Sequence, residues 1–314
     1  MSYKPLIVIV GPTAVGKTAL SIELALKING EIVSADSMQI YRYMDIGTAK
    51  STIEEQKGVK HYLIDEINPD EEFSVAKYKE LADRYIDEIL SKGKYPIMVG
   101  GTGLYVNSVI DNIKFSETIC DWHYRSELNH LAKVKGNEYV HQMLQQVDPI
   151  TAHRLHVNDI RRIIRALEVY KYTGIPISKH QVESRKEPSP YKTAIIGLTM
   201  DREWLYKRIN LRVDKMIEQG LIQEVQKLLK MGYSKEMTSM KGLGYKEMID
   251  YIENKITLEQ AVELLKRNTR RYAKRQLTWF RRDQRIHWIY ITQKDNLNDL
   301  LEKCLKYIEE IGII

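Results

Sequence analysis

A glycine-rich segment near the N-terminus has the residue types and the spacing of a phosphate-binding loop. Residues 11–18 follow the pattern Gly-x-x-x-x-Gly-Lys-Thr, with an apolar run of β type before them and a helical pattern directly after them. In this strand–loop–helix context the backbone N–H groups cradle a diphosphate at the positive end of the helix. Lys17 adds a positive charge, and the hydroxyl of Thr18 can ligate Mg²⁺. The residues expected to bind the diphosphate are Gly11, Pro12, Thr13, Ala14, Val15, Gly16, Lys17 and Thr18.

Two further segments with possible chemistry follow the next predicted strands. The predicted strand 31–35 leads into Asp36, and the predicted strand 96–99 leads into residues 100–105, Gly-Gly-Thr-Gly-Leu-Tyr. In open α/β sheets ligands bind at the carboxyl ends of the strands, so Asp36 is a candidate for chemistry opposite the diphosphate. An Asx turn or a helix cap would explain Asp36 equally well. The glycines of the second segment allow the backbone to approach a ligand closely.

Two arginines could clamp a diphosphate. Arg208 and Arg212 lie four residues apart in a predicted helix over 202–219, so both project from one face. Ordinary ion pairs with Glu203 or Glu218 would also account for them. The sequence alone leaves both interpretations open.

A long basic segment predicts contact with a polyanion. A predicted helix covers 258–282, and its second half contains no Asp or Glu. Within it Arg267, Arg271 and Arg275 recur every four residues, with aromatic residues between the basic ones. An exposed helix normally mixes both charge signs, so this stripe indicates nucleic acid or a diphosphate as the partner. Residues 241–247, Lys-Gly-Leu-Gly-Tyr-Lys-Glu, open a helix with two glycines between basic residues and could hold a phosphate or a nucleotide.

The elements that must position these residues alternate in type. Strands and helices follow each other over the first hundred residues, including a possible strand over 59–64, which predicts a doubly wound parallel sheet. Residues 121–184 are almost entirely helical in pattern and rich in charge. We therefore expect an α/β fold with a P-loop NTPase-like parallel sheet flanked by helices. Its catalytic core would comprise 1–115 and 193–314, and 116–192 would form an inserted all-helical subdomain.

The composition fits a globular cytoplasmic protein. The chain has 314 residues, of which 43% are hydrophobic, enough for a sizeable core in one or two domains, and a formal net charge of +6. Its two cysteines, Cys120 and Cys304, have neither metal-ligand nor disulfide spacing, which favours a reducing compartment. Neither a signal peptide nor an apolar run of about 18 residues is present, so we expect no membrane association.

Three functions are compatible with a P-loop in such a chain. They are a small-molecule kinase, an RNA-modifying transferase whose loop holds the diphosphate of a different donor, and a non-catalytic nucleotide-dependent RNA-binding switch. An NTPase should carry an Asp for Mg²⁺ at the end of a second strand, but the strand 96–99 ends in Gly-Gly-Thr-Gly. Guanidinium groups and aromatic rings suit unpaired RNA bases. These observations favour the transferase.

The sequence resembles the bacterial tRNA dimethylallyltransferases over essentially its whole length. The family motifs are matched by six segments: 11–18, 34–41 (Ser-Ala-Asp-Ser-Met-Gln-Ile-Tyr), 100–105, 158–162 (Asn-Asp-Ile-Arg-Arg), 165–168 (Arg-Ala-Leu-Glu) and 269–281 (Thr-Arg-Arg-Tyr-Ala-Lys-Arg-Gln-Leu-Thr-Trp-Phe-Arg). The resemblance implies transfer of a dimethylallyl group from dimethylallyl diphosphate to N6 of an adenosine beside the anticodon, with diphosphate as the leaving group.

The resemblance also implies roles for single residues. Asp36 would accept the proton from the adenine amine as the new bond forms. The P-loop, Mg²⁺ on Thr18 and Arg212 would stabilise the charge on the diphosphate, with Arg208 as a weaker candidate. Thr102 would contact the target nucleotide or the reacting groups. The adenine pocket would be lined by Ser37, Met38 and Gln39.

The tRNA would be held on two sides. The helical insertion would clamp the anticodon stem-loop, and the 242–246 turn and the cationic helix would hold its other flank. The residues expected to contact tRNA are Asp36, Ser37, Met38, Gln39, Thr102, Arg125, Arg161, Arg162, Arg165, Gly242, Gly244, Lys246, Arg271 and Arg275. We expect a monomer. Two alternatives stay open: an adenylate isopentenyltransferase, which prenylates free AMP with the same core, and more distantly a P-loop small-molecule kinase.

Overall fold

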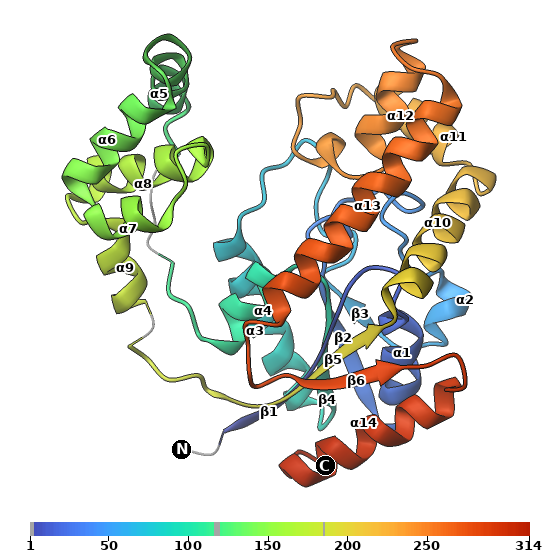
Figure 1. Cartoon of the computed structure of the whole chain (residues 1–314). Helices are drawn as coiled ribbons and strands as arrows, with labels where there is room; N and C mark the ends of the chain where they lie inside the picture. The colour runs from blue at the N-terminus through green and yellow to red at the C-terminus, as the bar shows by residue number, and fades with distance from the viewer. Residues whose placement is uncertain (1–2, 116–119, 185) are drawn as a thin grey trace. The chain divides into compact units, whose positions relative to one another are not determined.

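The centre of the fold is a sheet of parallel strands, drawn as arrows in Figure 1. The computed structural model describes residues 3–115, 120–184 and 186–314, and within them the sheet has six strands in the order β3-β2-β4-β1-β5-β6. All neighbouring strands pair in parallel. The strands are β1 (Lys4–Val10), β2 (Gly30–Ala35), β3 (His61–Tyr62), β4 (Tyr95–Gly100), β5 (Tyr191–Met200) and β6 (His287–Ile291). The predicted parallel α/β sheet is therefore confirmed.

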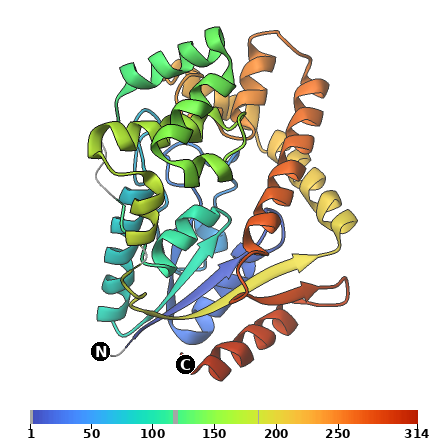
Figure 2. The same cartoon turned by 60° about the vertical axis from the view of Figure 1, so that its left-hand side comes forward.

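Helices cover both faces of this sheet. Helices α1 and α14 pack against one face, and α3 and α4 pack against the other (Figures 1 and 2). The helices in this part of the chain are α1 (Lys17–Ile28), α2 (Ile53–Gln56), α3 (Val75–Ser91), α4 (Gly103–Ile110), α10 (Arg202–Glu218), α11 (Leu221–Lys230), α12 (Tyr245–Ile252), α13 (Leu258–Phe280) and α14 (Leu297–Ile311), with a 3₁₀ turn, η1 (Ser239–Lys241).

Strand β1 is buried on both of its faces. Leu6, Val8 and Val10 belong to the apolar cluster under α3 and α4, whereas Ile7 and Ile9 belong to the cluster under α1 and α14. Successive side chains of a strand point to opposite faces, so a central strand of a parallel sheet must be apolar at every position. This is why the sequence before the P-loop is an unbroken apolar run.

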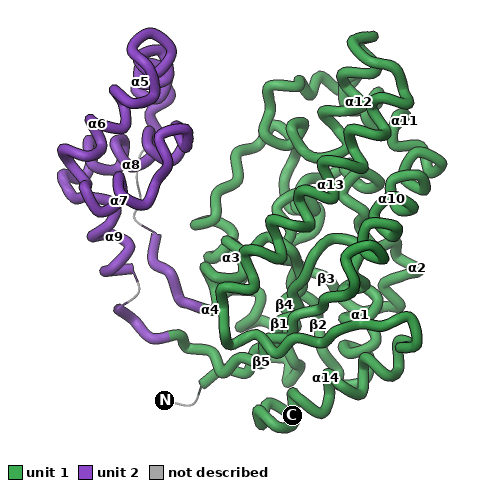
Figure 3. The backbone as a smooth tube through the Cα atoms, in the orientation of Figure 1, with its two compact units in different colours: residues 1–110, 189–314 green, residues 111–188 purple. Residues whose placement is uncertain are grey.

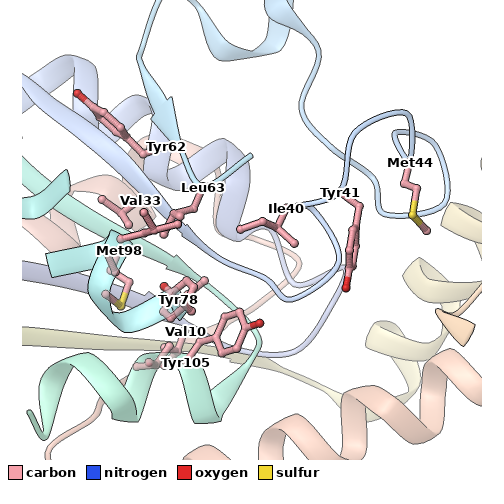
Figure 4. Close-up of a cluster of buried hydrophobic side chains, with 14 of the residues drawn as sticks. Val10, Val33, Ile40, Tyr41, Met44, Tyr62, Leu63, Tyr78, Met98 and Tyr105 are labelled. Atoms are coloured by element: carbon pink, nitrogen blue, oxygen red, sulfur yellow. The ribbon is translucent and has the colours of Figure 1, made fainter. Parts of the chain in front are cut away.

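Two stacked tyrosines anchor the cluster on the α3 and α4 side (Figure 4). The rings of Tyr78 from α3 and Tyr105 from α4 stack with their centroids 3.9 Å apart. The hydroxyl of Tyr78 donates a hydrogen bond of 3.1 Å to the backbone oxygen of Ser34. A buried phenol needs such a partner. The contact ties α3 to the end of β2, two residues before Asp36.

The expected strand over 59–64 is wrong in its length. Only His61 and Tyr62 form β3, at the edge of the sheet. The backbone of Leu63 has φ 61° and that of Asp65 has φ 58°. Left-handed backbone cannot continue a β-strand, so the apolar pattern overestimates this element.

The chain divides into two compact units, coloured separately in Figure 3. Unit 1 comprises 1–110 and 189–314 and carries the sheet, and unit 2 comprises 111–188 and is helical. The expected insertion began at residue 116, which lies outside the described residues, and ended at 192, inside β5. The helices of unit 2 are α5 (Trp122–Lys135), α6 (Asn137–Val147), α7 (Pro149–Arg154), α8 (Ile160–Thr173) and α9 (Ile177–Glu183).

Unit 2 has an apolar core of its own. Helices α5, α6 and α8 each contribute to one cluster, in which Leu128, Val140, Leu144 and Ile163 are fully or almost fully buried.

None of the helices in the described part of the chain is long and apolar enough to cross a membrane.

Candidate active site

The carboxyl ends of three neighbouring strands bring the predicted site together. In the register of the sheet Gly100 of β4 lies beside Val10 of β1 on one side and Ala35 of β2 on the other. The P-loop, Asp36 and the Gly-Gly-Thr-Gly turn therefore leave the sheet next to one another. Asp36, Lys17 and Arg212 line one cavity at this edge, which lies entirely within unit 1.

The P-loop requires glycine at its two ends. Gly11 has φ 147°, and a Cβ there would lie 2.6 Å from the backbone oxygen of Leu198. Gly16 has φ 110° and precedes the first residue of α1 without a side-chain cap. Val15 is buried in the core on the α1 side of the sheet and anchors the loop there. The first N–H groups of α1 therefore face the site, as a phosphate-binding loop needs.

Lys17 is the half-buried cation of the loop. Its Nζ donates hydrogen bonds to the backbone oxygens of Gly11, at 2.9 Å, and Pro12, at 2.8 Å. Burial and the charge of Arg212, against the opposing effect of Asp36, together lower the pKa of Lys17 to about 7. Two half-buried cations beside a single carboxylate favour an anionic ligand.

The two arginines of α10 contact the P-loop itself. Arg208 Nε donates to the backbone oxygen of Ala14 at 2.9 Å. Arg212 Nη1 lies 3.3 Å from Thr13 Oγ1, to which it donates, and burial lowers the pKa of this guanidinium. These contacts favour the diphosphate clamp over ordinary ion pairs on the surface of α10.

Asp36 both forms an Asx turn and lines the cavity, the two roles considered for it from the sequence. One carboxylate oxygen, Oδ1, accepts a hydrogen bond of 2.9 Å from the backbone N–H of Met38, which is an Asx turn. The same side chain also lines the cavity and raises the pKa of Lys17 and Arg212 through its charge. The turn fixes the carboxylate in place.

Thr102 holds the segment that carries Asp36. Its Oγ1 accepts a 3.0 Å hydrogen bond from the backbone N–H of Ser37 and lies 3.3 Å from Ser37 Oγ, to which it donates. Its own N–H donates to the backbone oxygen of Ala35 at 3.1 Å. The glycine turn after β4 and the acidic segment after β2 are thus joined directly.

Helix α13 adds residues that the analysis of its arginines missed. Gln276 is buried, accepts a 2.9 Å hydrogen bond from the backbone N–H of Thr13 and donates a 3.1 Å bond to the backbone oxygen of Gly101. Tyr272, one turn earlier, also lines the cavity, and burial together with the Asp36 charge raises the pKa of its phenol. Gly103 has no room for a Cβ, which would lie 2.2 Å from the ring of Trp279. The spacing of 272, 276 and 279 on one helix face was the available signal.

Gln39, which is predicted to line the adenine pocket, is tied to a loop that Glu224 caps. Gln39 Nε2 donates to the backbone oxygens of Thr48 and Ala49 at 3.2 and 3.3 Å. The carboxylate of Glu224 in α11 accepts hydrogen bonds of 2.8–3.1 Å from three successive backbone N–H groups, at 45–47, and one of 2.7 Å from Tyr245. The sequence offered no pattern that would link Glu224 to this loop.

Comparisons with known proteins decide the family. A family model described as IPP transferase matches residues 39–283. The chain belongs to this family. The proteins named tRNA dimethylallyltransferase of Acetivibrio thermocellus and Carboxydothermus hydrogenoformans are 58% and 56% identical to it, over 98% and 100% of this chain and 98% and 99% of theirs.

Solved structures of IPP transferases have the same fold. A tRNA isopentenylpyrophosphate transferase from Bacillus halodurans is 46% identical, with a TM-score of 0.73 over 98% of both chains. A eukaryotic dimethylallyltransferase, described as acting on tRNA, is 29% identical with a TM-score of 0.81, over 98% of this chain and 79% of its own.

The cavity of this IPP transferase fits a Mg²⁺ ion held mainly by its ligand. In the described ranges no group of three His, Cys, Asp or Glu side chains comes together as a metal cage. Mg²⁺ in phosphate sites keeps several waters and takes one or two protein oxygens together with phosphate oxygens. The Thr18 hydroxyl and the Asp36 carboxylate line the cavity, so the donor set is of the right kind.

Two of the predicted tRNA contacts are engaged inside unit 2. Arg125 donates from Nε and Nη2 to the two carboxylate oxygens of Glu168 at 2.9 and 2.8 Å, and Arg165 Nη1 pairs with the same carboxylate at 2.5 Å. Glu168 is fully buried. Burial opposes its charge, but the two arginines hold its pKa below the usual value. These arginines stabilise the subdomain, whereas Arg161 and Arg162 are exposed. Contact of all four with tRNA stays a prediction.

The remaining predicted contacts lie in the turn before α12, on α12 itself and on α13. The N–H of Gly244 donates to Glu247 Oε2 at 2.9 Å, so a capping carboxylate occupies the group that was expected to hold a phosphate. A Cβ at Gly242 would lie 2.5 Å from Met38 Cε, so this turn packs against Met38. Arg271 and Arg275 are exposed, as the polyanion hypothesis requires. Their contact with tRNA, like that of Lys246, stays a prediction.

Proposed function

We propose that this chain transfers a dimethylallyl group from dimethylallyl diphosphate to N6 of the adenosine next to the anticodon in tRNA. The bond from the allylic carbon to the diphosphate oxygen breaks, the bond from that carbon to N6 forms, and N6 loses a proton. The observation that carries this proposal is the pairing of a diphosphate cradle with one fixed carboxylate in the same cavity.

The cradle acts on the leaving group. Negative charge grows on the diphosphate as its bond to carbon breaks, and fixed positive groups stabilise that charge without having to reorganise. Lys17 and Arg212 are half-buried and hydrogen-bonded to the loop, and Arg208 is bonded to its backbone. Thr18 would hold Mg²⁺, which supplies further positive charge to the diphosphate oxygens when bound.

The carboxylate acts on the nucleophile. The exocyclic amine of adenine is weakly nucleophilic, so removal of its proton by Asp36 as the bond forms lowers the barrier. Thr102 and the Asx turn at Met38 fix the carboxylate relative to the loop. We propose that Ser37, Met38 and Gln39 contact the adenine of the bound tRNA.

The RNA must deliver an unstacked base. An adenosine in a folded loop cannot reach a buried carboxylate without swinging out of its stack. The exposed stripe of Arg267, Arg271 and Arg275 on α13 supplies phosphate contacts, and Arg161 and Arg162 of unit 2 offer a second basic surface. The described action of the eukaryotic relative on tRNA supports this substrate, and such a reaction belongs in the cytoplasm.

One assay separates this function from its alternatives. The protein is incubated with labelled dimethylallyl diphosphate and either an anticodon stem-loop or AMP, and separately with labelled ATP. Label in the stem-loop adenosine supports the proposal. Label in AMP alone would make the protein an adenylate isopentenyltransferase, and phosphate transfer from ATP to a small molecule would make it a kinase.

A further inference from the structure

One buried polar atom in the cavity has no partner in the protein. Among the side chains of the described residues, Nε2 of His61 is the buried nitrogen or oxygen without a hydrogen bond. His61 lines the same cavity as Thr18, Asp36 and Ser21. A buried polar atom normally finds a partner, because losing its bond to water costs free energy. Its partner is therefore a molecule that enters the cavity.

The position of His61 follows from the sheet. In β3 it pairs with Ile32 of β2, and the next residue, Tyr62, belongs to the core under α3. Because side chains alternate across a strand, His61 faces the α1 side, where the P-loop helix begins. The short edge strand thus places an imidazole beside the first turns of α1.

The contact of the other ring nitrogen, Nδ1, determines whether Nε2 carries a proton. His61 Nδ1 lies 2.8 Å from the backbone oxygen of Val59. A carbonyl oxygen only accepts, so Nδ1 carries the proton and Nε2 presents a lone pair. Burial lowers the pKa of His61, in keeping with a neutral ring. A lone pair repels phosphate oxygens, and Mg²⁺ prefers oxygen ligands, so the fitting partner is a water that donates a hydrogen bond.

We propose that His61 Nε2 accepts a hydrogen bond from a water of the Mg²⁺ ion at Thr18, and so positions the metal with its diphosphate. This inference rests on the proposed metal site. Mg²⁺ retains several of its waters in such sites, and these waters donate hydrogen bonds to acceptors around them. Groups outside the coordination sphere of a metal commonly tune its affinity by about tenfold or more. His61 is a positioning residue and touches neither the allylic carbon nor adenine.

Two substitutions test the two ring nitrogens of His61 separately. His61→Asn keeps a donor near the Nδ1 position, for the Val59 oxygen, and loses the acceptor. His61→Gln places an amide oxygen near the Nε2 position. His287→Asn is the control, because His287 is exposed and stacked on Tyr307.

The experiment measures metal binding without turnover. Full-length protein saturated with the unreactive dimethylallyl S-thiolodiphosphate is titrated with Mn²⁺, which is followed by electron paramagnetic resonance. Thermal melts establish that each variant is folded at the assay temperature. We expect His61→Asn to weaken Mn²⁺ binding about 3- to 10-fold, the range for one lost hydrogen bond. His61→Gln should recover most of this loss, and His287→Asn should match the wild type. Affinity for the analogue without metal should not change.

The outcomes separate the inference from the function it rests on. Folded His61→Asn and His61→Gln proteins that both bind Mn²⁺ like the wild type would overturn the inference and leave the metal site standing. A wild-type protein that binds the analogue but no Mn²⁺ would remove the metal site, and the role of His61 with it.

Discussion

Replacing Gln276 should lower both stability and activity more than replacing any arginine of α13. The buried amide joins two loops, because it accepts from the Thr13 N–H at 2.9 Å and donates to the Gly101 oxygen at 3.1 Å. Gln276→Met is nearly isosteric and removes both hydrogen bonds. Each of the two buried backbone groups left without a partner costs about 1–3 kcal/mol, so we expect a loss of about 2–6 kcal/mol in the free energy of unfolding. For a domain of this size the melting temperature should fall by about 4–24 °C.

The functional cost should exceed what unfolding explains. Both loops carry chemistry, since one is the P-loop and the other leads to Thr102, so the folded variant should lose at least about tenfold in kcat/KM for the donor. Calorimetric melts and steady-state kinetics, at a temperature where the variant is folded, measure the two effects. Lys274→Met, an exposed change on the same helix, is the control for stability and donor binding. A Gln276→Met protein with wild-type melting and donor kinetics would refute the link between the loops.

The remaining predictions concern charge. Wild-type affinity for a stem-loop should fall steeply with salt, and R271Q/R275Q should lower the slope of log K against log salt by about 1–2; a flat wild-type response would remove α13 as a phosphate contact. Arg125→Met should destabilise unit 2 by about 3–5 kcal/mol, because it leaves Glu168 buried with one partner fewer; an unchanged melt contradicts this. The pKa of Glu168 is lowered on folding, so its contribution is complete above the unfolded value of about 4.3 and is lost as pH falls through the folded value, which acid-denaturation curves of wild type and Glu168→Gln should show. Glu224→Ala should raise KM for RNA and leave donor affinity unchanged, because it frees three N–H groups of the loop bonded to Gln39, a residue proposed to contact adenine; an effect on donor affinity instead would contradict that proposal.

The sequence predicts those parts of the fold that depend on local patterns. An apolar run followed by Gly-x-x-x-x-Gly-Lys-Thr determines β1, the P-loop and the start of α1, and alternating elements predict the parallel sheet. Once the sheet is parallel, Asp36 and Thr102 must meet at its carboxyl edge, because both follow a strand directly. The short β3 was not predictable from an apolar pattern, since its end depends on the left-handed backbone of Leu63.

Partners far apart in the sequence could not be predicted in the same way. The pairing of Arg125 with Glu168 spans 43 residues and two helices, and no local pattern distinguishes it from a surface charge that awaits RNA. Gln276 and Thr13 are 263 residues apart. The sequence gives no sign that Gln276, one glutamine among many arginines, has a structural role. That role follows only from the fold, which places its amide against the Thr13 N–H. Charged residues on a helix are therefore ambiguous until their neighbours are known.

The central claim is that Asp36 takes the proton from adenine while the P-loop holds the departing diphosphate. Its most direct test is single-turnover transfer by Asp36→Asn, with labelled dimethylallyl diphosphate and a stem-loop, beside separate measurements of RNA and donor binding. We predict a folded variant that binds the stem-loop with wild-type affinity and transfers the label about 10²- to 10⁴-fold more slowly. Transfer by Asp36→Asn at a near-wild-type rate would contradict the account.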